Sequence, residues 1–281
     1  MEVQAFAKVN LTLEVLGKRA DGYHDLRSVV ARIGIADRIT ITDAPGTGVA
    51  LEVKDTGAQN LNAMCAAEHN LAYRAAALLG GGVKLCIYKQ IHLGAGLGGG
   101  SADAAAVLAA LGARRGKSVA ELIELAAQLG SDVPALVAGG CVLMEGRGER
   151  VSALPPPAAV LPVVVALPRD TFCPTPKVYA TYAAAAAKKS LHKTAEILYN
   201  MRIALSGTAV DVAKACMNDL GEAAACVAPA VGELVARMRA AGAINPVVSG
   251  SGAAVYAVCA DHAQAQALAA EVAGVATEIV R

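Results

Sequence analysis

The stretch that decides the fold reads HLGAGLGGGSA, from His92 to Ala102. Apolar and polar residues alternate before it from Val83 to Tyr88, and alanine and leucine dominate after it from Ser101 to Leu111. This order predicts a strand, a loop and a helix. Glycines lack side chains, so their backbone N–H groups can approach an anion closely, and the N-terminus of the following helix adds a favourable dipole. We therefore expect this loop to bind phosphate.

Two familiar phosphate-binding loops fit this stretch poorly. A Walker A loop requires a lysine after its glycines, and none follows here. A dinucleotide fingerprint matches at Gly94, Gly96 and Gly99, but about 20 residues on there is only Glu121, inside a helix cap rather than at a strand end. The preceding strand also alternates, whereas a Rossmann strand buried on both faces is continuously apolar. A nicotinamide-dependent oxidoreductase stays open as the weaker alternative.

Antiparallel strands are expected before the loop. Strict alternation from Val9 to Val15 predicts a half-buried strand with Lys8 on its polar face. Its apolar face would hold Val9, Leu11, Leu13 and Val15, and its polar face Asn10, Thr12 and Glu14. Strand-like sequence recurs at 38–42 and 49–53, and Asn70 is placed to cap a helix that ends before Gly80.

Helices and then a second sheet are expected after the loop. Ser118 and Glu121 form a capping-box pattern, and Pro134 suits the first turn of the next helix. The proline run at 155–157 is the best candidate boundary, which gives one domain over 1–154 and another over 155–281. A strand at 160–166, alanine-rich helices and a final strand, helix and strand follow. The fold class is α+β.

Composition narrows the class of protein further. Of the 281 residues, 55% are hydrophobic and 17% charged, which excludes a disordered chain. A formal net charge of +1 argues against binding nucleic acid or a membrane surface through bulk electrostatics. The most apolar run, at 158–168, is too short to span a membrane, and no signal peptide is visible. Seven scattered cysteines without metal-ligand spacing indicate reduced thiols, so we expect a cytoplasmic protein without a protein metal site.

Four segments, in order along nearly the whole chain, resemble motifs of the GHMP kinases. They are the glycine loop, Ala7-Lys8-Val9-Asn10-Leu11 with Arg19 to Leu26, Leu129-Gly130-Ser131-Asp132-Val133-Pro134, and Val248-Ser249-Gly250-Ser251-Gly252-Ala253. The resemblance implies the GHMP kinase fold, with a first domain like domain 2 of ribosomal protein S5 and a ferredoxin-like second domain. It also implies an ATP-dependent kinase of the branch whose alcohol substrate carries a cytidine diphosphate group, in isoprenoid precursor synthesis.

The same resemblance implies roles for particular residues. Asp132 would take the proton of the substrate hydroxyl, while Lys8 stabilises negative charge on the carboxylate or the transferring group. Asn10 and Thr175 would contact the substrate, Tyr23 and Tyr179 would enclose its cytosine, and His24 would bond the cytosine edge. The ATP-binding residues would be His92, Leu93, Gly94, Ala95, Gly96, Leu97, Gly98, Gly99, Gly100, Ser101 and Ala102. The family usually has proline at His92 and a second serine at Ala102. Mg²⁺ is expected to accompany ATP, with no protein ligand assigned.

Other interpretations stay open at this point. Asp132 precedes Pro134 and could be a plain helix cap, and Lys8 could be a solvated lysine on an exposed sheet face. A GHMP kinase that acts on homoserine, mevalonate or a sugar is a further alternative, and the presence of Tyr23 and His24 argues against it. A catalytically dead binding protein is less compatible with the presence of both Lys8 and Asp132. The expected partner is a small molecule, and the chain is expected to be a monomer or a homodimer.

Overall fold

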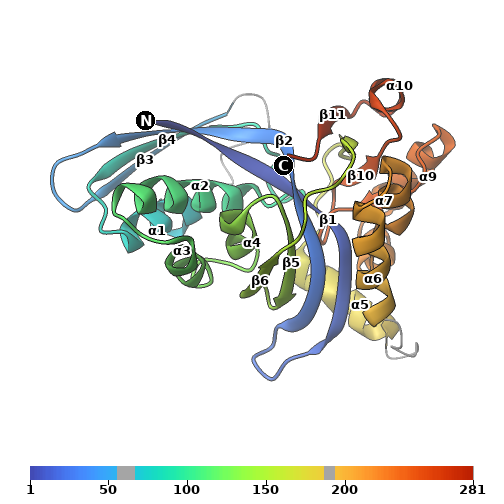
Figure 1. Cartoon of the computed structure of the whole chain (residues 1–281), viewed down its shortest axis with the longest axis horizontal. Helices are drawn as coiled ribbons and strands as arrows, with labels where there is room; N and C mark the ends of the chain where they lie inside the picture. The colour runs from blue at the N-terminus through green and yellow to red at the C-terminus, as the bar shows by residue number, and fades with distance from the viewer. Residues whose placement is uncertain (56–66, 187–193, 281) are drawn as a thin grey trace.

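The computed structural model describes residues 1–55, 67–186 and 194–280. In it, two β-sheets lie beside each other with helices around them (Figure 1). The first half contains β1 (Glu2–Lys18), β2 (His24–Asp43), β3 (Val49–Asp55), η2 (Ala67–His69), α1 (Leu71–Leu78), β4 (Val83–Lys89), α2 (Gly99–Arg114), α3 (Val119–Ala126), α4 (Val133–Ala138), β5 (Cys141–Gly146) and β6 (Arg150–Ala153). The second half contains β7 (Pro162–Ala166), α5 (Thr175–Ala186), α6 (Thr194–Leu205), α7 (Ala209–Ala215), β8 (Met217–Asn218), α8 (Gly221–Val227), α9 (Pro229–Ala240), β9 (Val247–Val248), β10 (Val255–Val258), α10 (His262–Val272) and β11 (Val275–Glu278).

The larger sheet is organised around the two longest strands, β1 and β2. Its order is β3-β4-β2-β1-β8, and β5 pairs with the part of β2 that β4 leaves free, with β6 beyond it. Most pairs are antiparallel; β3 with β4 and β1 with β8 are parallel. The smaller sheet, β11-β7-β10-β9, is antiparallel throughout. This confirms the α+β class. Within the described ranges, the glycine loop belongs to a mostly antiparallel sheet and not to a doubly wound parallel one, which removes the structural basis for a dinucleotide fold.

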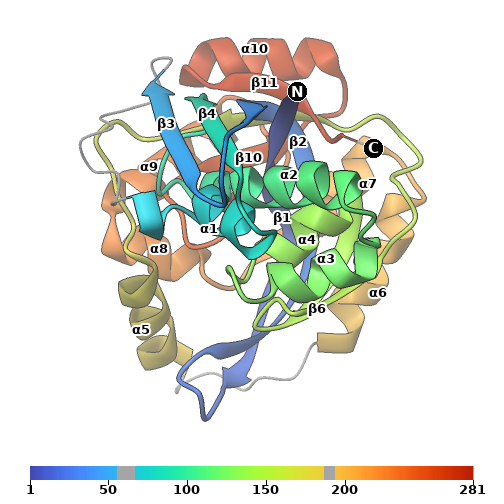
Figure 2. The same ribbon diagram turned by 90° about the vertical axis from the view of Figure 1, so that its left-hand side faces the viewer.

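The two halves of the chain share the larger sheet. The proline run at 155–157 lies between β6 and β7, yet β8 from the second half pairs with β1. Figure 2 shows α1 to α4 gathered on the side of the first sheet, with α5, α8 and α9 to one side and α6 and α7 to the other. The domain boundary near residue 154 stays a prediction.

The strand β1 corrects one sequence interpretation. Its pairing register with β2 shifts between Asn10 and Thr12, so one residue is added and the side chains that follow change faces. Leu11 accordingly packs in the core of the first sheet, whereas Leu13 packs in the core of the second half. The strand is also buried on both faces: Lys8 and Asn10 are as inaccessible as their apolar neighbours. The expectation of a half-buried strand with one continuous polar face was wrong.

Local signals set several helix boundaries as expected. Asn70 accepts hydrogen bonds from the N–H groups of Ala72 and Tyr73 at the start of α1. Ser118 and Glu121 form the predicted capping box at the start of α3. These bonds satisfy N–H groups that have no partner within the helix.

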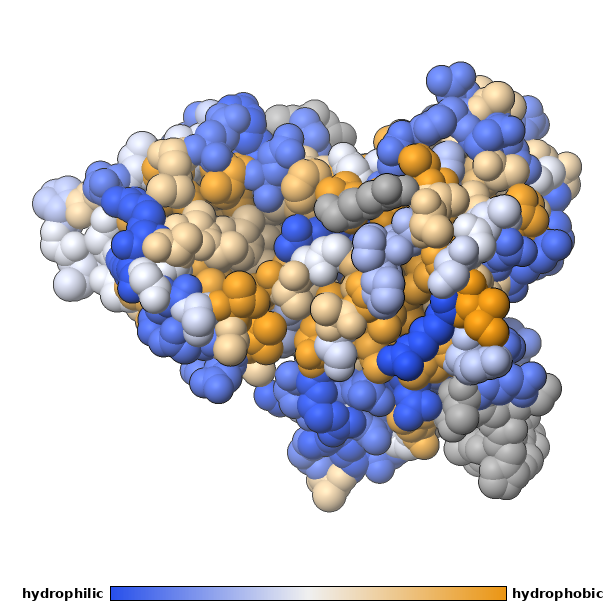
Figure 3. Space-filling view, viewed as in Figure 1, coloured by the Kyte–Doolittle hydropathy of each residue, from blue (hydrophilic) through white to orange (hydrophobic). Residues whose placement is uncertain are grey.

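Surface polarity varies over the molecule. In Figure 3 hydrophilic residues gather at the β1–β2 hairpin, where Arg19 pairs with Asp21, and around α10.

Among the described residues, no helix combines the length and apolar character needed to cross a membrane. The cysteines among the described residues are all free thiols, and Cys65 lies outside the described residues.

Candidate active site

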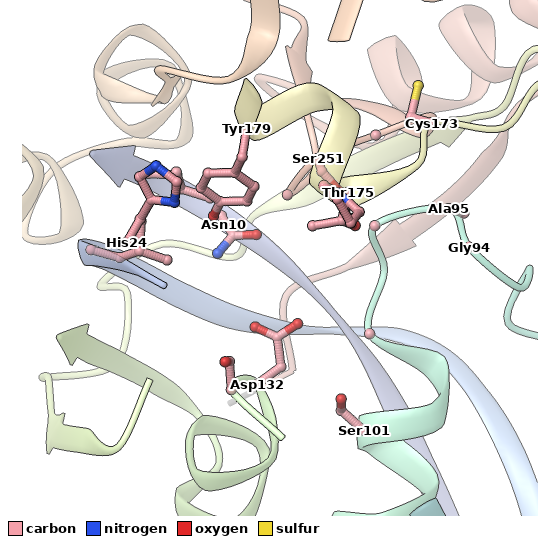
Figure 4. Close-up of a pocket in the computed structure, with 18 of the residues that line it drawn as sticks. Asn10, His24, Gly94, Ala95, Ser101, Asp132, Cys173, Thr175, Tyr179 and Ser251 are labelled. Carbon is pink, nitrogen blue, oxygen red and sulfur yellow. The ribbon is translucent and has the colours of Figure 1, made fainter. Parts of the chain in front are cut away.

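A cleft of about 850 Å³ lies where the two halves of the chain meet. It collects nearly all of the residues that the sequence singled out, from β1, the β1–β2 turn, the glycine loop, the start of α4 and the start of α5 (Figure 4). The predicted residues that line it are Lys8, Asn10, Tyr23, His24, His92, Leu93, Gly94, Ala95, Gly96, Gly98, Gly99, Gly100, Ser101, Asp132, Thr175 and Tyr179. Residues far apart in sequence therefore form one site.

Two predicted ATP contacts do not line the cleft. Leu97 is buried in the core, and only its carbonyl oxygen faces β1, where it accepts the N–H of Lys8 at 3.0 Å. Ala102 is also buried and lines a separate groove behind α2. Leu97 lies between Gly96 and Gly98, which both line the cleft, and Ala102 directly follows Ser101, which also lines it. The assignment of these two residues to ATP binding stays a prediction.

Close contacts leave little room for side chains at several glycines of the loop. Gly94, Gly96 and Gly98 have positive φ angles of 66°, 78° and 72°, which favour glycine. A Cβ on Gly96 would come within 2.1 Å of the carbonyl oxygen of Ser249, and the Ser249 hydroxyl donates to the Gly96 carbonyl at 2.9 Å. The turn around Ser249 thus fixes the loop at Gly96, shortly before the first N–H groups of α2. These N–H groups lack partners within the helix and suit an anion.

Asp132 and Lys8 face each other across the cleft. The Asp132 carboxylate lies 3.4 Å from the Lys8 ammonium, and Lys8 also donates to Asn10 Oδ1 at 2.8 Å. Asp132 occupies the N-cap position of α4, but its side chain makes no capping hydrogen bond. Gly98 is beside this pair, since a Cβ there would lie 3.1 Å from Lys8 Cγ. The carboxylate is therefore directed into the cleft, and Lys8 is a buried cation rather than a solvated one.

A buried serine that the sequence interpretation missed orients this pair. Ser28 on β2 accepts a hydrogen bond from Asn10 Nδ2 at 2.8 Å and donates to the Thr12 carbonyl at 2.6 Å. From the second half, the Tyr256 hydroxyl donates to the Asn10 carbonyl at 2.7 Å. Asn10 is thereby fixed, and its amide oxygen fixes Lys8. A lone serine in an apolar strand gives no local signal of such a role.

Aromatic rings form the other end of the cleft. The rings of His24 and Tyr179 stack with their centroids 4.7 Å apart, while Tyr23 is exposed beside Arg147, whose guanidinium carbon lies 5.4 Å from the centre of its ring. Burial and the charge of Lys18 lower the pKa of His24, so the imidazole is neutral at neutral pH. Burial, aided by the Asp132 charge, raises the pKa of Tyr179. A neutral imidazole can both donate and accept hydrogen bonds.

Hydroxyl groups and further lining residues complete the cleft. The hydroxyls of Thr175 and Ser251 are 2.8 Å apart, which joins the start of α5 to the turn after β9. Lys18, Arg147 and Phe172 also line the cleft, and none of them was predicted. Within the described residues, no three His, Cys, Asp or Glu side chains gather as they would around a metal ion.

Comparison with known proteins identifies the class. Family models for the N-terminal and C-terminal domains of GHMP kinases match residues 64–140 and 183–276. The chain belongs to the GHMP kinases, as its motifs predicted. Solved structures of a homoserine kinase from Cytophaga hutchinsonii and a mevalonate kinase from L. major share the fold, with TM-scores of 0.73 and 0.74 at 17% identity.

Nearer relatives define the branch. A 4-diphosphocytidyl-2-C-methyl-D-erythritol kinase from Pelotomaculum thermopropionicum is 40% identical, covering 95% of this chain and 91% of that one. The kinase of this name from Gloeobacter violaceus is 35% identical over 98% of this chain and 90% of that one. A crystal structure of 4-(cytidine 5'-diphospho)-2C-methyl-D-erythritol kinase matches with a TM-score of 0.76 and 34% identity over the full length of both chains. Within the GHMP kinases, the chain belongs to this kinase family.

Proposed function

We propose that this chain transfers the γ-phosphoryl group of ATP to the 2-hydroxyl group of 4-diphosphocytidyl-2-C-methyl-D-erythritol, a step of the non-mevalonate isoprenoid pathway. The observation that carries the proposal is the position of the Asp132–Lys8 pair, 3.4 Å apart, in the cleft that also holds the glycine loop and the His24–Tyr179 ring pair. Such a reaction requires a loop that binds phosphate, a general base for the hydroxyl proton, and a group of rings that recognises cytosine.

Asp132 acts as the general base. Its carboxylate accepts the proton of the substrate hydroxyl as the hydroxyl oxygen attacks the γ-phosphorus, and ADP leaves with the electron pair of the broken P–O bond. The Lys8 ammonium, held by Asn10, lies where it stabilises both the ionised carboxylate and the charge on the transferring group. A positioned base and a fixed cation supply the two main requirements of phosphoryl transfer to an alcohol.

The glycine loop holds the phosphates of ATP. Gly98 lies beside Lys8, so the γ-phosphate belongs at this end of the loop, next to the first turn of α2. Mg²⁺ is normally held by substrate phosphates, waters and one or two carboxylates. The Ser101 hydroxyl lines the cleft here and is an oxygen donor that fits this ion, which would neutralise phosphate charge.

The aromatic end selects cytidine. Tyr179 presents a ring face for stacking, Tyr23 stands exposed at the same end, and neutral His24 can bond the donor and acceptor groups of the cytosine edge. A site that bonds a base edge rejects a base with the opposite pattern more strongly than an apolar pocket does. The substrate therefore enters with its nucleoside at this end and its polyol at Asp132.

A coupled ADP-release assay tests the proposal. We expect turnover with the diphosphocytidyl substrate and at least about 100-fold lower kcat/KM with mevalonate, homoserine or galactose. Preference for one of these three acceptors would assign the chain to another activity of the GHMP kinases. ATP binding without turnover of any acceptor would indicate a binding protein instead.

A further inference from the structure

A buried ionic cluster lies directly under the glycine loop, outside the cleft. It consists of Asp37 on β2, Lys89 at the end of β4 and Asp103 in α2, each at most 2% exposed. Lys89 donates to both carboxylates, with 2.8 Å between its Nζ and Asp103 Oδ2. This cluster, which we call the loop anchor, joins three elements at the point where the loop begins and ends. The phosphoryl-transfer mechanism does not use any of its three side chains.

The loop anchor contacts the backbone at both ends of the loop. At the first end, Asp37 Oδ1 accepts the N–H groups of Gln90 at 2.5 Å and Ile91 at 2.8 Å. At the second end, a Cβ on Gly99 would lie 3.4 Å from Lys89 Nζ, so the ammonium packs against the first residue of α2. The first residue of α2 therefore packs against Lys89, the same ammonium that pairs with Asp37 at the first end of the loop.

The charge balance of the loop anchor points away from simple stabilisation. The loop anchor places two buried carboxylates around a single ammonium group. In the described part of the chain, Asp103 Oδ1 has no hydrogen-bond partner. Replacing buried ion pairs with apolar residues is often neutral or stabilising, so such a cluster is a poor device for stability alone. Its geometry suits the fixing of one backbone conformation.

We propose that Asp37, Lys89 and Asp103 are positioning residues for ATP: the loop anchor fixes the glycine loop and the first turn of α2 where they bind the phosphates. The effect reaches ATP through Gln90, Ile91 and Gly99. The diphosphocytidyl substrate contacts the aromatic end and Asp132, which the anchor does not touch. The anchor therefore controls ATP affinity separately from affinity for the alcohol substrate.

The test is an Asp37→Asn variant. Asparagine keeps one oxygen for the two backbone N–H groups, but its amide nitrogen can direct a donor at the Lys89 ammonium. A displacement of a positioned group by about 1 Å can lower the reaction rate by up to about 100-fold. We expect the dissociation constant of a fluorescent ATP analogue and the KM for ATP to rise by about 10- to 100-fold. The KM for the diphosphocytidyl substrate should stay within twofold.

A control variant separates positioning from stability. Ile41 is buried on the same strand as Asp37 but pairs with Leu85, away from the loop. Ile41→Val should lower the melting temperature and leave ATP affinity unchanged. If Asp37→Asn fails to fold, Lys89→Arg decides by the same thresholds, because the larger guanidinium keeps the charge but crowds Gly99.

Two results would overturn the inference. One is a lowered melting temperature with unchanged ATP affinity, as a merely structural cluster predicts. The other is an equal rise in KM for both substrates. The KM measurements rest on the proposed function, whereas binding of the fluorescent ATP analogue can be measured without an alcohol substrate. A wild-type protein that binds the analogue without phosphorylating the diphosphocytidyl substrate would refute the proposed function and still test the anchor.

Discussion

Replacing Asp132 with asparagine removes the proposed base and little else. Asparagine has the shape of aspartate and can still accept a hydrogen bond from Lys8, which lies 3.4 Å away. It cannot take the proton of the attacking hydroxyl. Since Asp132 makes no capping hydrogen bond to α4, no cap is lost. The variant therefore separates chemistry from folding.

The two effects differ in size. Loss of a general base lowers kcat by about 10²–10⁴-fold, which corresponds to a barrier increase of about 3–5 kcal/mol. Loss of the charge attraction to Lys8 affects stability less, because the Asp132 side chain is 29% exposed and solvent screens the pair. We expect a stability loss of about 1 kcal/mol and a fall in melting temperature of about 2–4 °C. KM for both substrates should change little.

Rapid-quench single turnover with γ-labelled ATP measures the chemical step directly. The matched control is Asp261→Asn, because Asp261 does cap a helix, accepting the N–H of Gln264 at 2.8 Å at the start of α10. Asparagine caps almost as well as aspartate, so this control should keep both activity and stability. An Asp132→Asn protein that transfers phosphate within about tenfold of the wild-type rate would refute the base assignment.

Three further predictions concern the glycine loop, the recognition of cytosine and the stability of the fold. Gly98→Val should abolish binding of an ATP analogue in a folded protein, because the side chain would meet Lys8 and the positive φ disfavours it; unchanged affinity would place ATP elsewhere. The uridine analogue of the substrate should have at least about 10-fold lower kcat/KM, since its edge reverses the donor pattern that His24 reads; equal use would refute the recognition claim. Burial raises the pKa of Glu14 from 4.5 to about 7, so the folded protein keeps a proton that the unfolded chain releases, and stability falls as pH rises through this window. Glu14→Gln should therefore melt like wild type near pH 4.5 and several degrees higher at pH 8, and parallel melting curves at both pH values would contradict this.

Local patterns predicted much of the fold because they act over a few residues. The alternation at 83–88 became β4, and the capping signals at Asn70 and Ser118 begin helices as expected. The glycine loop was found for the same reason: its glycines and the helix start are contiguous. The resemblance to a family then brought Lys8 and Asp132 together before any distance was known.

Long-range features could not be predicted in this way. The register shift after Asn10 depends on how β1 pairs with β2, and it moved Leu13 to the face opposite to the one expected. The loop anchor joins Asp37 and Lys89 across 52 positions of sequence. Each is an ordinary charged residue by its local context. Only the folded chain places their charges together, under a loop whose importance was already evident.

The central claim is that this cleft phosphorylates the 2-hydroxyl group of a cytidine diphosphate polyol. Phosphorus NMR of a reaction with ATP and 4-diphosphocytidyl-2-C-methyl-D-erythritol tests it most directly. We predict one new phosphomonoester signal, coupled to the carbon skeleton at position 2, that grows in equal amount with ADP while the diphosphate signals of the substrate persist. Formation of ADP with free inorganic phosphate, or a phosphomonoester at another hydroxyl, would contradict the account.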